Sequence, residues 1–209
     1  YTAGLYHLQD KASVLVGHVA YAGSSSWLHM DLTAGPGNKA SHLAQLAGSC
    51  IGLEVEPRRA LDIKKLARRL RILVDVVASD SMSPPLRLRE PSSLIVDPPC
   101  SNLGRLSYDP EVKLWITRRR IEELTRLQRG LLRTAVEEAP RGSLITYSAC
   151  TFTKLECEGV VEEALKAGAQ PVQQEPFIGL PAPPRGLAQR MLPHVHDTAG
   201  FYIAKLVKE

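Results

Sequence analysis

The sequence predicts an α/β fold, in which a mostly parallel sheet carries helices on both faces. Short apolar segments rich in β-branched residues alternate with amphipathic segments long enough for helices. The 209 residues are 44% hydrophobic and 23% charged, the composition of an ordinary globular domain. No apolar run reaches the length that a transmembrane helix needs. We therefore expect a single domain over residues 1–209 that does not contact a membrane.

Strands and helices alternate regularly in the first half of the chain. A strand over 27–33 ends in a loop that contains glycine and proline, and a helix over 38–47 follows it. A second strand covers 50–55. The next helix, 57–70, has a proline in its first turn, where the missing N–H would have no helical partner. The valine-rich segment 72–78 is the third strand.

The second half continues this alternation and ends differently. The predicted elements are a strand at 93–96, a helix at 118–138, a strand at 143–147, a helix at 155–167, and strands at 171–173 and 201–207. The run Asp97-Pro98-Pro99 stops the first of these strands. Apolar residues form one stripe along the long helix. No convincing helix separates the last two strands, so we expect them to form an antiparallel pair.

The start of the sequence and its cysteines indicate the compartment. Tyr1 is followed by neither a basic nor an apolar leader, so no signal peptide is predicted, and the missing Met suggests a fragment that lacks an upstream region. The four cysteines are Cys50, Cys100, Cys150 and Cys157. They form no CxxC pair, and His194 and His196 lie far along the chain, so we expect no metal site. We expect free thiols and a cytoplasmic protein.

The formal net charge of +4 is unevenly distributed. Basic side chains concentrate in the predicted helices 57–70 and 118–138. The first cluster is Arg58, Arg59, Lys64, Lys65, Arg68, Arg69 and Arg71, and the second is Arg118, Arg119, Arg120, Arg126, Arg129 and Arg133. Such clusters can track a phosphate backbone. They are equally typical of a solvated helix face, and the sequence leaves both interpretations open.

Ligands of such sheets bind beyond the carboxyl ends of the strands. The first of these loops, Asp31-Leu-Thr-Ala-Gly-Pro-Gly-Asn-Lys39, has glycines that let the backbone approach a ligand, but it matches neither a Walker loop nor GxGxxG. Glu54 ends the second strand, where an acid can accept the hydroxyls of a ribose or stabilise the next helix N-terminus. Asp80 can bind an adenine amino group or cap the following turn. Together these strand ends outline a nucleoside-shaped site.

The fourth and fifth strand ends each carry a cysteine. Asp97-Pro-Pro-Cys100-Ser101 follows one strand, and Tyr147-Ser-Ala-Cys150 ends the other. Neighbouring parallel strands lie about 4.8 Å apart, so both thiols can face one substrate. The alternative is a pair of buried structural cysteines, since free cysteine is among the most buried residue types.

Segments along the whole chain resemble, in order, the motifs of the RNA cytosine-5 methyltransferases of the Nol1/Nop2/Sun family. They are Gln9-Asp10 with Ser13, Thr33-Ala-Gly-Pro-Gly-Asn-Lys39, Glu54 with Arg59, Asp97-Pro-Pro-Cys100-Ser-Asn-Leu-Gly104, Leu127-Gln128, Tyr147-Ser-Ala-Cys150 with Glu156, and Pro193-His194 with Gly200-Phe-Tyr-Ile-Ala204. Six positions depart from the family pattern: Thr33, Gly35, Asn38, Glu54, Asn102 and Ala149. None of these departures removes an expected catalytic group.

The resemblance implies a Rossmann-like, S-adenosylmethionine-dependent methyltransferase fold with a seven-stranded, mostly parallel sheet and an antiparallel last strand. It implies that S-adenosylmethionine binds at the first strand ends, through Thr33, Ala34, Gly35, Pro36, Gly37, Asn38, Lys39, Glu54, Arg59, Asp80 and Asp97. The expected partner is tRNA or rRNA, bound by a monomer. An additional RNA-binding region often selects the target in this family, and we expect that region to be absent from this chain.

The resemblance also implies the catalytic residues: Cys150 as the nucleophile, Cys100 as the group that helps product leave, and Asp97 and Lys39 beside the cytosine and the cofactor. The C5 atom of cytosine is a poor nucleophile, and addition of a thiolate at C6 makes it reactive toward a methyl donor. The expected product is 5-methylcytosine. The alternatives are a non-catalytic RNA-binding or assembly factor with the same fold, or methyl transfer to another substrate.

Overall fold

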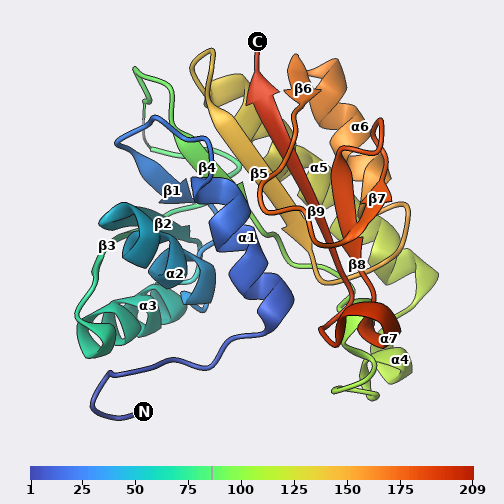
Figure 1. Cartoon of the computed structure of the whole chain (residues 1–209), viewed down its shortest axis with the longest axis horizontal. Helices are drawn as coiled ribbons and strands as arrows, with labels where there is room; N and C mark the ends of the chain where they lie inside the picture. Colours follow the sequence, from blue (N-terminus) through green and yellow to red (C-terminus); the bar gives the residue numbers. More distant parts are fainter. Residues whose placement is uncertain (86) are drawn as a thin grey trace.

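A nine-stranded mixed sheet forms the centre of the computed structural model, which describes residues 1–85 and 87–209 (Figure 1). The strands are β1 (His29–Asp31), β2 (Ser49–Glu54), β3 (Leu73–Ala78), β4 (Ser93–Val96), β5 (Leu144–Ala149), β6 (Ala169–Pro171), β7 (Leu180–Ala182), β8 (Ala188–Met191) and β9 (Phe201–Lys208). Their order across the sheet is β3-β2-β1-β4-β5-β9-β8-β7, and β6 also pairs with β9. Strands β1 to β5 are parallel, so their carboxyl ends meet at one edge.

Strand β9 runs against the parallel strands and has partners on both sides. It pairs with β5 along Tyr202–Val207, and on its other side it pairs with β8 near its start and with β6 near its end. The predicted antiparallel closing pair is confirmed, with the earlier strand at Ala169–Pro171 instead of 171–173. The structure adds β7 and β8 to the seven predicted strands. Both are too short for a clear alternating pattern, and β7 contains a proline, which is tolerated at a sheet edge.

The helices form a layer on each face of the sheet (Figure 1). They are α1 (Lys11–Tyr21), α2 (Asn38–Ala47), α3 (Pro57–Leu70), α4 (Val112–Trp115), α5 (Arg118–Glu138), α6 (Glu158–Lys166) and α7 (Pro193–His196), with a 3₁₀ turn at Leu103–Arg105. Helices 38–47, 57–70 and 118–138 are confirmed at their predicted bounds. The predicted helix 155–167 begins only at Glu158. No helix of the described residues is both long and apolar enough to cross a membrane.

Alternation along the strands divides the core in two. On β4, Leu94 and Val96 join a cluster with residues of α5 and α6, and Ile95 joins a second cluster with residues of α1 and α2. On β9, Tyr202 faces the first cluster and Ile203 the second. Both faces of the sheet are thus buried, as expected when helices cover both sides of parallel strands.

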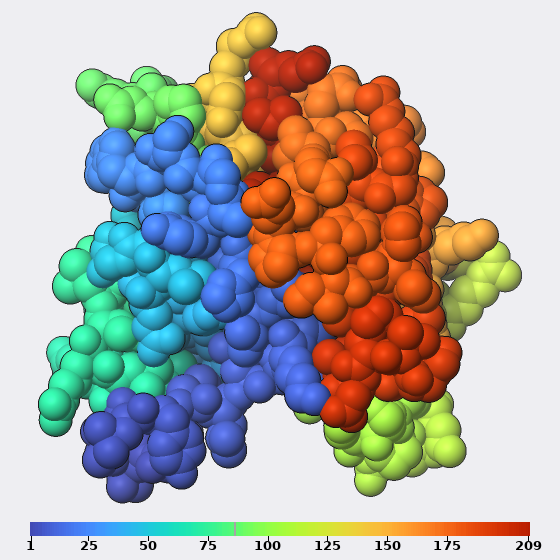
Figure 2. All heavy atoms as spheres, in the orientation of Figure 1, coloured from blue at the N-terminus to red at the C-terminus, as the bar shows by residue number. Residues whose placement is uncertain are grey.

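The carboxyl edge of the sheet is the edge that opens to the outside. Figure 2 shows a notch at the lower margin, between the dark blue N-terminal segment and the lime and red segments that contain α4 and α7. Leu8 and Gln9 on one side, and Arg105, Tyr108 and Ala199 on the other, line the same cavity. The fold therefore presents the strand ends to a ligand from this edge.

Candidate active site

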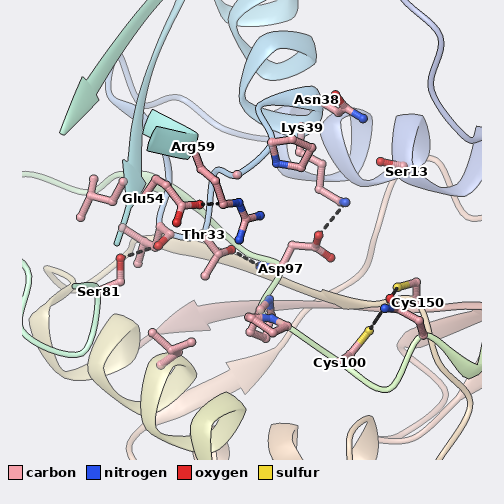
Figure 3. A pocket seen from close by; sticks show the side chains of 18 of the residues that line it. Ser13, Thr33, Asn38, Lys39, Glu54, Arg59, Ser81, Asp97, Cys100 and Cys150 are labelled. Carbon is pink, nitrogen blue, oxygen red and sulfur yellow. Dashed lines mark hydrogen bonds and ion pairs between the residues drawn. The ribbon is translucent and has the colours of Figure 1, made fainter. Parts of the chain in front are cut away.

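One cavity of about 840 Å³ lies where the parallel strands end (Figure 3). Eleven of the thirteen residues predicted for the site line it: Thr33, Gly35, Pro36, Asn38, Lys39, Glu54, Arg59, Asp80, Asp97, Cys100 and Cys150. Ala34 and Gly37 belong to the same loop but do not line the cavity. Ala34 is buried and donates its N–H to the Leu53 carbonyl (2.8 Å). The cavity thus joins the strand ends that carry Glu54 and Asp80 to both thiols.

The loop between β1 and α2 is shaped by two glycines and a side-chain contact. Gly37 is the N-cap of α2 and has a φ of 111°, a conformation that side chains other than glycine rarely adopt. Gly35 lies so close to Glu54 that a Cβ would be 2.0 Å from its Oε2 atom. Asn38 accepts a hydrogen bond at Oδ1 from His7 Nε2 (2.9 Å). This hydrogen bond holds the side chain of Asn38, one of the positions that depart from the family pattern, against the N-terminal segment.

Two acids stand at the ends of β2 and β3, and each also makes a local backbone contact. Glu54 Oε1 accepts from the Glu56 N–H (2.9 Å), and its Oε2 lies 3.8 Å from Arg59 Nε. Asp80 Oδ1 accepts from the Met82 N–H (2.8 Å). Both acids therefore stabilise the backbone that follows them, which is one of the two roles predicted for each. This role does not exclude ligand binding, since both side chains also line the cavity.

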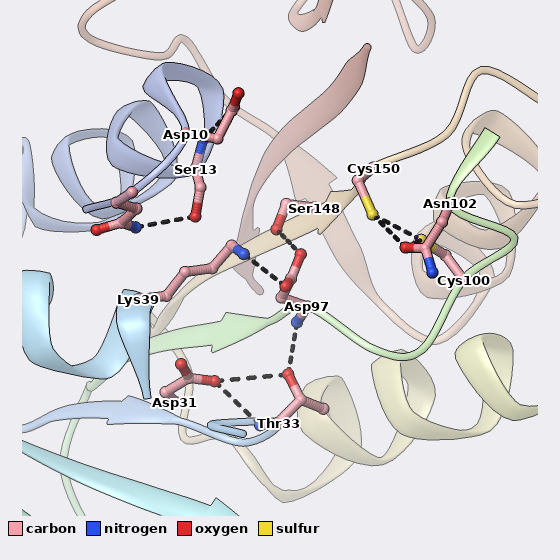
Figure 4. Close-up of polar contacts among 11 residues, drawn as sticks. Asp10, Ser13, Asp31, Thr33, Lys39, Asp97, Cys100, Asn102, Ser148 and Cys150 are labelled. Atoms are coloured by element: carbon pink, nitrogen blue, oxygen red, sulfur yellow. Dashed lines mark hydrogen bonds and ion pairs between the residues drawn. The ribbon is translucent and has the colours of Figure 1, made fainter. Parts of the chain in front are cut away.

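Asp97 connects three elements at the centre of the site (Figure 4). Its Oδ2 lies 2.6 Å from Lys39 Nζ, and its Oδ1 accepts from Ser148 Oγ (2.6 Å). Its backbone N–H donates to Thr33 Oγ1 (2.7 Å). The carboxylate is therefore fixed by β5 and by the start of α2, and the loop after β1 fixes its backbone.

Two buried ionisable groups adjoin Asp97. Burial alone would lower the pKa of Lys39, but attraction to Asp97 and Asp31 outweighs it, so the pKa lies above its usual value. Burial raises the pKa of Asp31 to about 7, and the negative charge of Asp97 adds to this effect. Asp31 Oδ1 accepts from the Thr33 N–H (3.0 Å). Lys39 therefore stays charged, whereas Asp31 titrates near neutral pH.

The two cavity thiols meet as their strand positions predict. Sγ of Cys100 lies 3.1 Å from Sγ of Cys150, well beyond the disulfide bond length of about 2.05 Å, and both side chains are partly exposed. Cys150 donates to Asn102 Oδ1 (2.8 Å). The hydrogen bond to Cys150, together with burial, raises the pKa of Cys100 well above its usual value. By contrast, Cys50 and Cys157 are buried away from the cavity, and burial raises the pKa of both.

A buried carboxylate ties together the loops that carry these thiols. Glu156 is fully buried and accepts from the Ser101 N–H (2.7 Å), Ser101 Oγ (2.6 Å) and Gln128 Nε2 (3.1 Å). It also accepts from Thr153 Oγ1 (2.7 Å). This network explains why the predicted helix 155–167 begins later, because residues 150–157 form a loop around the carboxylate. Gln128 and Glu156 were marked only by the family resemblance.

Four residues of the site were not assigned a role from the sequence. Asp31, Ser81, Ser148 and Phe201 contact the polar centre or line the cavity. Strand alternation is the signal that identifies two of them, since Asp31 and Thr33, and likewise Ser148 and Cys150, are two positions apart and share a face. Ser81 donates to the Leu32 carbonyl across a long sequence separation, and nothing local signals that contact.

A family model described as "16S rRNA methyltransferase RsmB/F" matches residues 22–207. This chain belongs to that family. A tRNA (cytosine(72)-C(5))-methyltransferase from Pyrococcus horikoshii is 34% identical over 185 residues, which cover 86% of this chain and 46% of that protein. A mouse 28S rRNA (cytosine-C(5))-methyltransferase is 29% identical over 227 residues, which cover 100% of this chain and 28% of that protein.

Solved structures of the family share the fold of this chain. The crystal structure of NSun6 from Pyrococcus horikoshii with SFG has a TM-score of 0.88 and 31% sequence identity, and the match covers 99% of this chain and 54% of that one. This chain thus spans about half of that structure and less than half of both curated relatives. The α/β methyltransferase fold with antiparallel closing strands is confirmed.

The cavity fits S-adenosylmethionine, the cofactor of this family. Two carboxylates line it at the ends of β2 and β3, and a nucleoside carries hydroxyl and amino groups that can donate to such acceptors. Gly35 lines it as well, and a side chain there would fill the space beside Glu54. The other end of the cavity holds the thiols. Among residues 1–85 and 87–209, no group of three or more His, Cys, Asp or Glu side chains is placed to hold a metal ion.

Proposed function

We propose that this chain is the catalytic domain of an S-adenosylmethionine-dependent methyltransferase that forms 5-methylcytosine in tRNA or rRNA. One observation carries the proposal: two thiols 3.1 Å apart share a cavity with an ion-paired carboxylate and with the acids Glu54 and Asp80. The names of the similar proteins, which act on cytosine C5 of tRNA or rRNA, support the same substrate class.

The cofactor end is assigned to the strand ends that carry acids. Glu54 holds the ribose hydroxyls, Asp80 lies toward the adenine, and the loop from Thr33 to Lys39 follows the rest of the molecule. When bound, S-adenosylmethionine supplies an electrophilic methyl group on a sulfonium. Asp97 and Lys39 separate this end from the thiols, so the methyl donor and the target base meet beside them.

The chemistry of the other end is assigned to the two cysteines. The Cys150 thiolate forms a bond to C6 of the cytosine, and the electrons of the C5–C6 double bond make C5 nucleophilic. Asp97 shares a proton with the charged Lys39 and through it donates to N3 of the ring as negative charge builds there. Once C5 carries the methyl group, its proton is lost to a base, the double bond re-forms, and the Cys150 sulfur leaves. We assign Cys100 to this release step. The target base must be unpaired or flipped out of a helix to reach the cavity.

Single cysteine substitutions test these roles. We expect Cys150→Ala to abolish methyl transfer to RNA and to keep the affinity for S-adenosylhomocysteine, because the cofactor end is unchanged. We expect Cys100→Ala to accumulate a covalent RNA–protein adduct on a denaturing gel, because release is blocked. Cys50→Ala, a cysteine outside the cavity, is the matched control and should transfer normally.

Two outcomes of this experiment count against the proposal. Methylated RNA released at the normal rate by Cys100→Ala contradicts the role of that thiol. Absence of any transfer to bulk RNA by the unmodified chain, with intact cofactor binding, favours a non-catalytic RNA-binding factor on the same fold.

We also propose that residues 1–209 act as one catalytic domain and as a monomer in the cytoplasm. The free state of all four cysteines supports a reducing compartment. Light scattering of the purified chain tests the oligomeric state, and a mass of twice 22.9 kDa contradicts the monomer.

A further inference from the structure

Gly35, which lines the cavity, lies against the carboxylate of Glu54. A Cβ on Gly35 would be 2.0 Å from Glu54 Oε2 and 2.7 Å from Arg59 Nη2. Gly35 is not among the residues with a positive φ, so its backbone conformation does not require glycine. The reason for a glycine at this position is therefore space, and the space is taken by the end of the Glu54 side chain.

The Glu54 carboxylate is held in this position by its surroundings. Its Oε1 accepts from the Glu56 N–H at 2.9 Å, Arg59 lies on its other side, and the residue is only 6% exposed. A glutamate reaches one methylene further than an aspartate, about 1.5 Å. The carboxylate thus projects over Gly35 into the wall of the cavity, where a methyl group at position 35 would otherwise sit.

We propose that positions 35 and 54 act as a pair: the missing side chain at 35 makes room for the longer acid at 54 and sets where its carboxylate meets the cofactor ribose. Gly35 is then a positioning residue that acts through Glu54. This inference rests on the proposed function, because it takes the ribose as the ligand of Glu54. Beyond that function, the inference states that the long side chain of Glu54 requires the absence of a side chain at position 35.

Each single change should misplace the carboxylate, and the effect of Gly35→Ala should disappear when residue 54 is the shorter aspartate. In Gly35→Ala the clash is with the flexible end of a side chain, so we expect Glu54 to swing aside with little change in thermal stability. The affinity for S-adenosylhomocysteine should fall roughly 10- to 100-fold, as for a lost hydrogen bond to a charged group. Glu54→Asp alone should weaken binding in the same range, because the carboxylate withdraws from the ribose.

The decisive measurement is a double-mutant cycle on S-adenosylhomocysteine affinity by calorimetry, which needs no RNA and no turnover. We expect the double variant G35A/E54D to bind as tightly as Glu54→Asp alone, because the shorter acid no longer meets the methyl group at position 35. Losses that simply add in the double variant, or an unchanged affinity in either single variant, overturn the pairing. Because Glu54→Asp leaves Gly35 in place, it tests the pairing even if Gly35→Ala folds poorly.

Two further variants separate this inference from the function on which it rests. If Glu54→Ala keeps full affinity, the ribose role of Glu54 is wrong and the pairing fails with it. If Glu54→Ala weakens binding and Gly35→Ala does not, only the pairing fails. Gly159→Ala is the matched control: it lies in α6 outside the cavity, where a Cβ would lie 3.2 Å from its nearest neighbour, and it should leave the affinity unchanged.

Discussion

Asp31 lies fully buried at the end of β1, below the Lys39–Asp97 pair, with a pKa raised to about 7. In the unfolded chain an aspartate titrates near pH 4. The folded state therefore binds the extra proton between about pH 4 and pH 7, and the stability that this proton confers is lost as the pH rises through that window. Above pH 7 the buried charge remains as a cost.

Asp31→Asn should remove this pH dependence. The amide oxygen keeps the acceptor for the Thr33 N–H, and the side chain stays neutral at every pH. We expect the variant to match the wild type near pH 4.5 and to exceed it at pH 8, by at most on the order of 4 kcal/mol. Urea unfolding at the two pH values measures the difference. Exposed Asp75→Asn is the control, and parallel pH profiles for Asp31→Asn and the wild type contradict the argument.

The pKa of the Cys100 thiol should depend on the presence of its neighbour Cys150. The leading cause of the raised pKa of Cys100 is its hydrogen bond to Cys150, so removing that partner should lower the pKa. We expect Cys150→Ala to speed the alkylation of Cys100 by iodoacetamide at pH 8 several-fold, because more of the thiol is ionised. Mass spectrometry of the labelled peptide gives the rate. An unchanged or slower rate at Cys100 contradicts this dependence.

At the scale of single residues, the sequence predicts what short motifs encode. Cys100 and Cys150 stand at the ends of neighbouring strands, and this placement alone brings their sulfur atoms together. The acidity of Asp31 and the contact of Ser81 with the Leu32 carbonyl depend on burial and on distant chain segments. No local pattern reports them, so they became visible only in the structure.

Helices α3 and α5 both carry basic clusters, but their ionic surroundings differ. On α5, Arg118 pairs with Glu122, and Arg119 and Arg120 pair with Glu123. On α3, Arg58, Lys64 and Arg68 are exposed, and none of them forms an ion pair within the part of the chain that the structure describes. The free positive charge is therefore denser on α3.

Charge removal on the two helices should have unequal effects on RNA binding. We expect the triple change R58Q/K64Q/R68Q to weaken binding and to reduce the slope of log affinity against log salt by about 2, as for three lost phosphate contacts on a single strand. The matched change R118Q/R119Q/R120Q should have the smaller effect, because these arginines already face glutamates. Filter binding at several salt concentrations tests the order. Equal slopes for the two variants contradict it.

At the scale of elements, the sequence predicts best those helices and strands that are long enough to show a complete pattern of apolar and polar residues. Helix 118–138 has an apolar stripe long enough to fix both ends, and Thr117 caps it by accepting from the Arg120 N–H. In the hairpin, β7 has three residues and β8 has four. Strand β8 joins the rest of the sheet by pairing with β9, which lies outside the hairpin. Such elements form through tertiary pairing, so their own sequence predicts them poorly.

At the scale of the whole molecule, a close contact between two glycines joins the halves of the site. The Gly200 N–H donates to the Gly104 carbonyl (2.7 Å), and the Gly104 N–H donates to the Cys150 carbonyl (3.0 Å). These bonds connect the loops after β4 and β5 to the segment that leads into β9. A Cβ on Gly104 would be 1.9 Å from the Gly200 carbonyl oxygen and 2.9 Å from that of Cys150.

Gly104→Ala should therefore destabilise the fold as a whole. The clash is with backbone atoms, which cannot move aside as a side chain does, and we expect a loss of about 3 kcal/mol or more in the free energy of unfolding. Urea denaturation measures it. Gly159→Ala is the comparison, because a Cβ there would meet its nearest neighbour, the Lys154 carbonyl oxygen, at 3.2 Å, a tight contact but a much milder one than at Gly104. A midpoint within experimental error of the wild type contradicts the expectation.

The central place of β9 has a consequence for the order of events during synthesis. Strands β5, β6 and β8 all find their hydrogen-bond partner in residues 201–208, which a ribosome adds after every one of them. Until that segment is synthesised, β5, β6 and β8 each have an unpaired edge. Phe201, which lies under the ammonium of Lys39, is then also missing from the cavity. A nascent chain can therefore complete the cavity only after residues 201–208 have been synthesised.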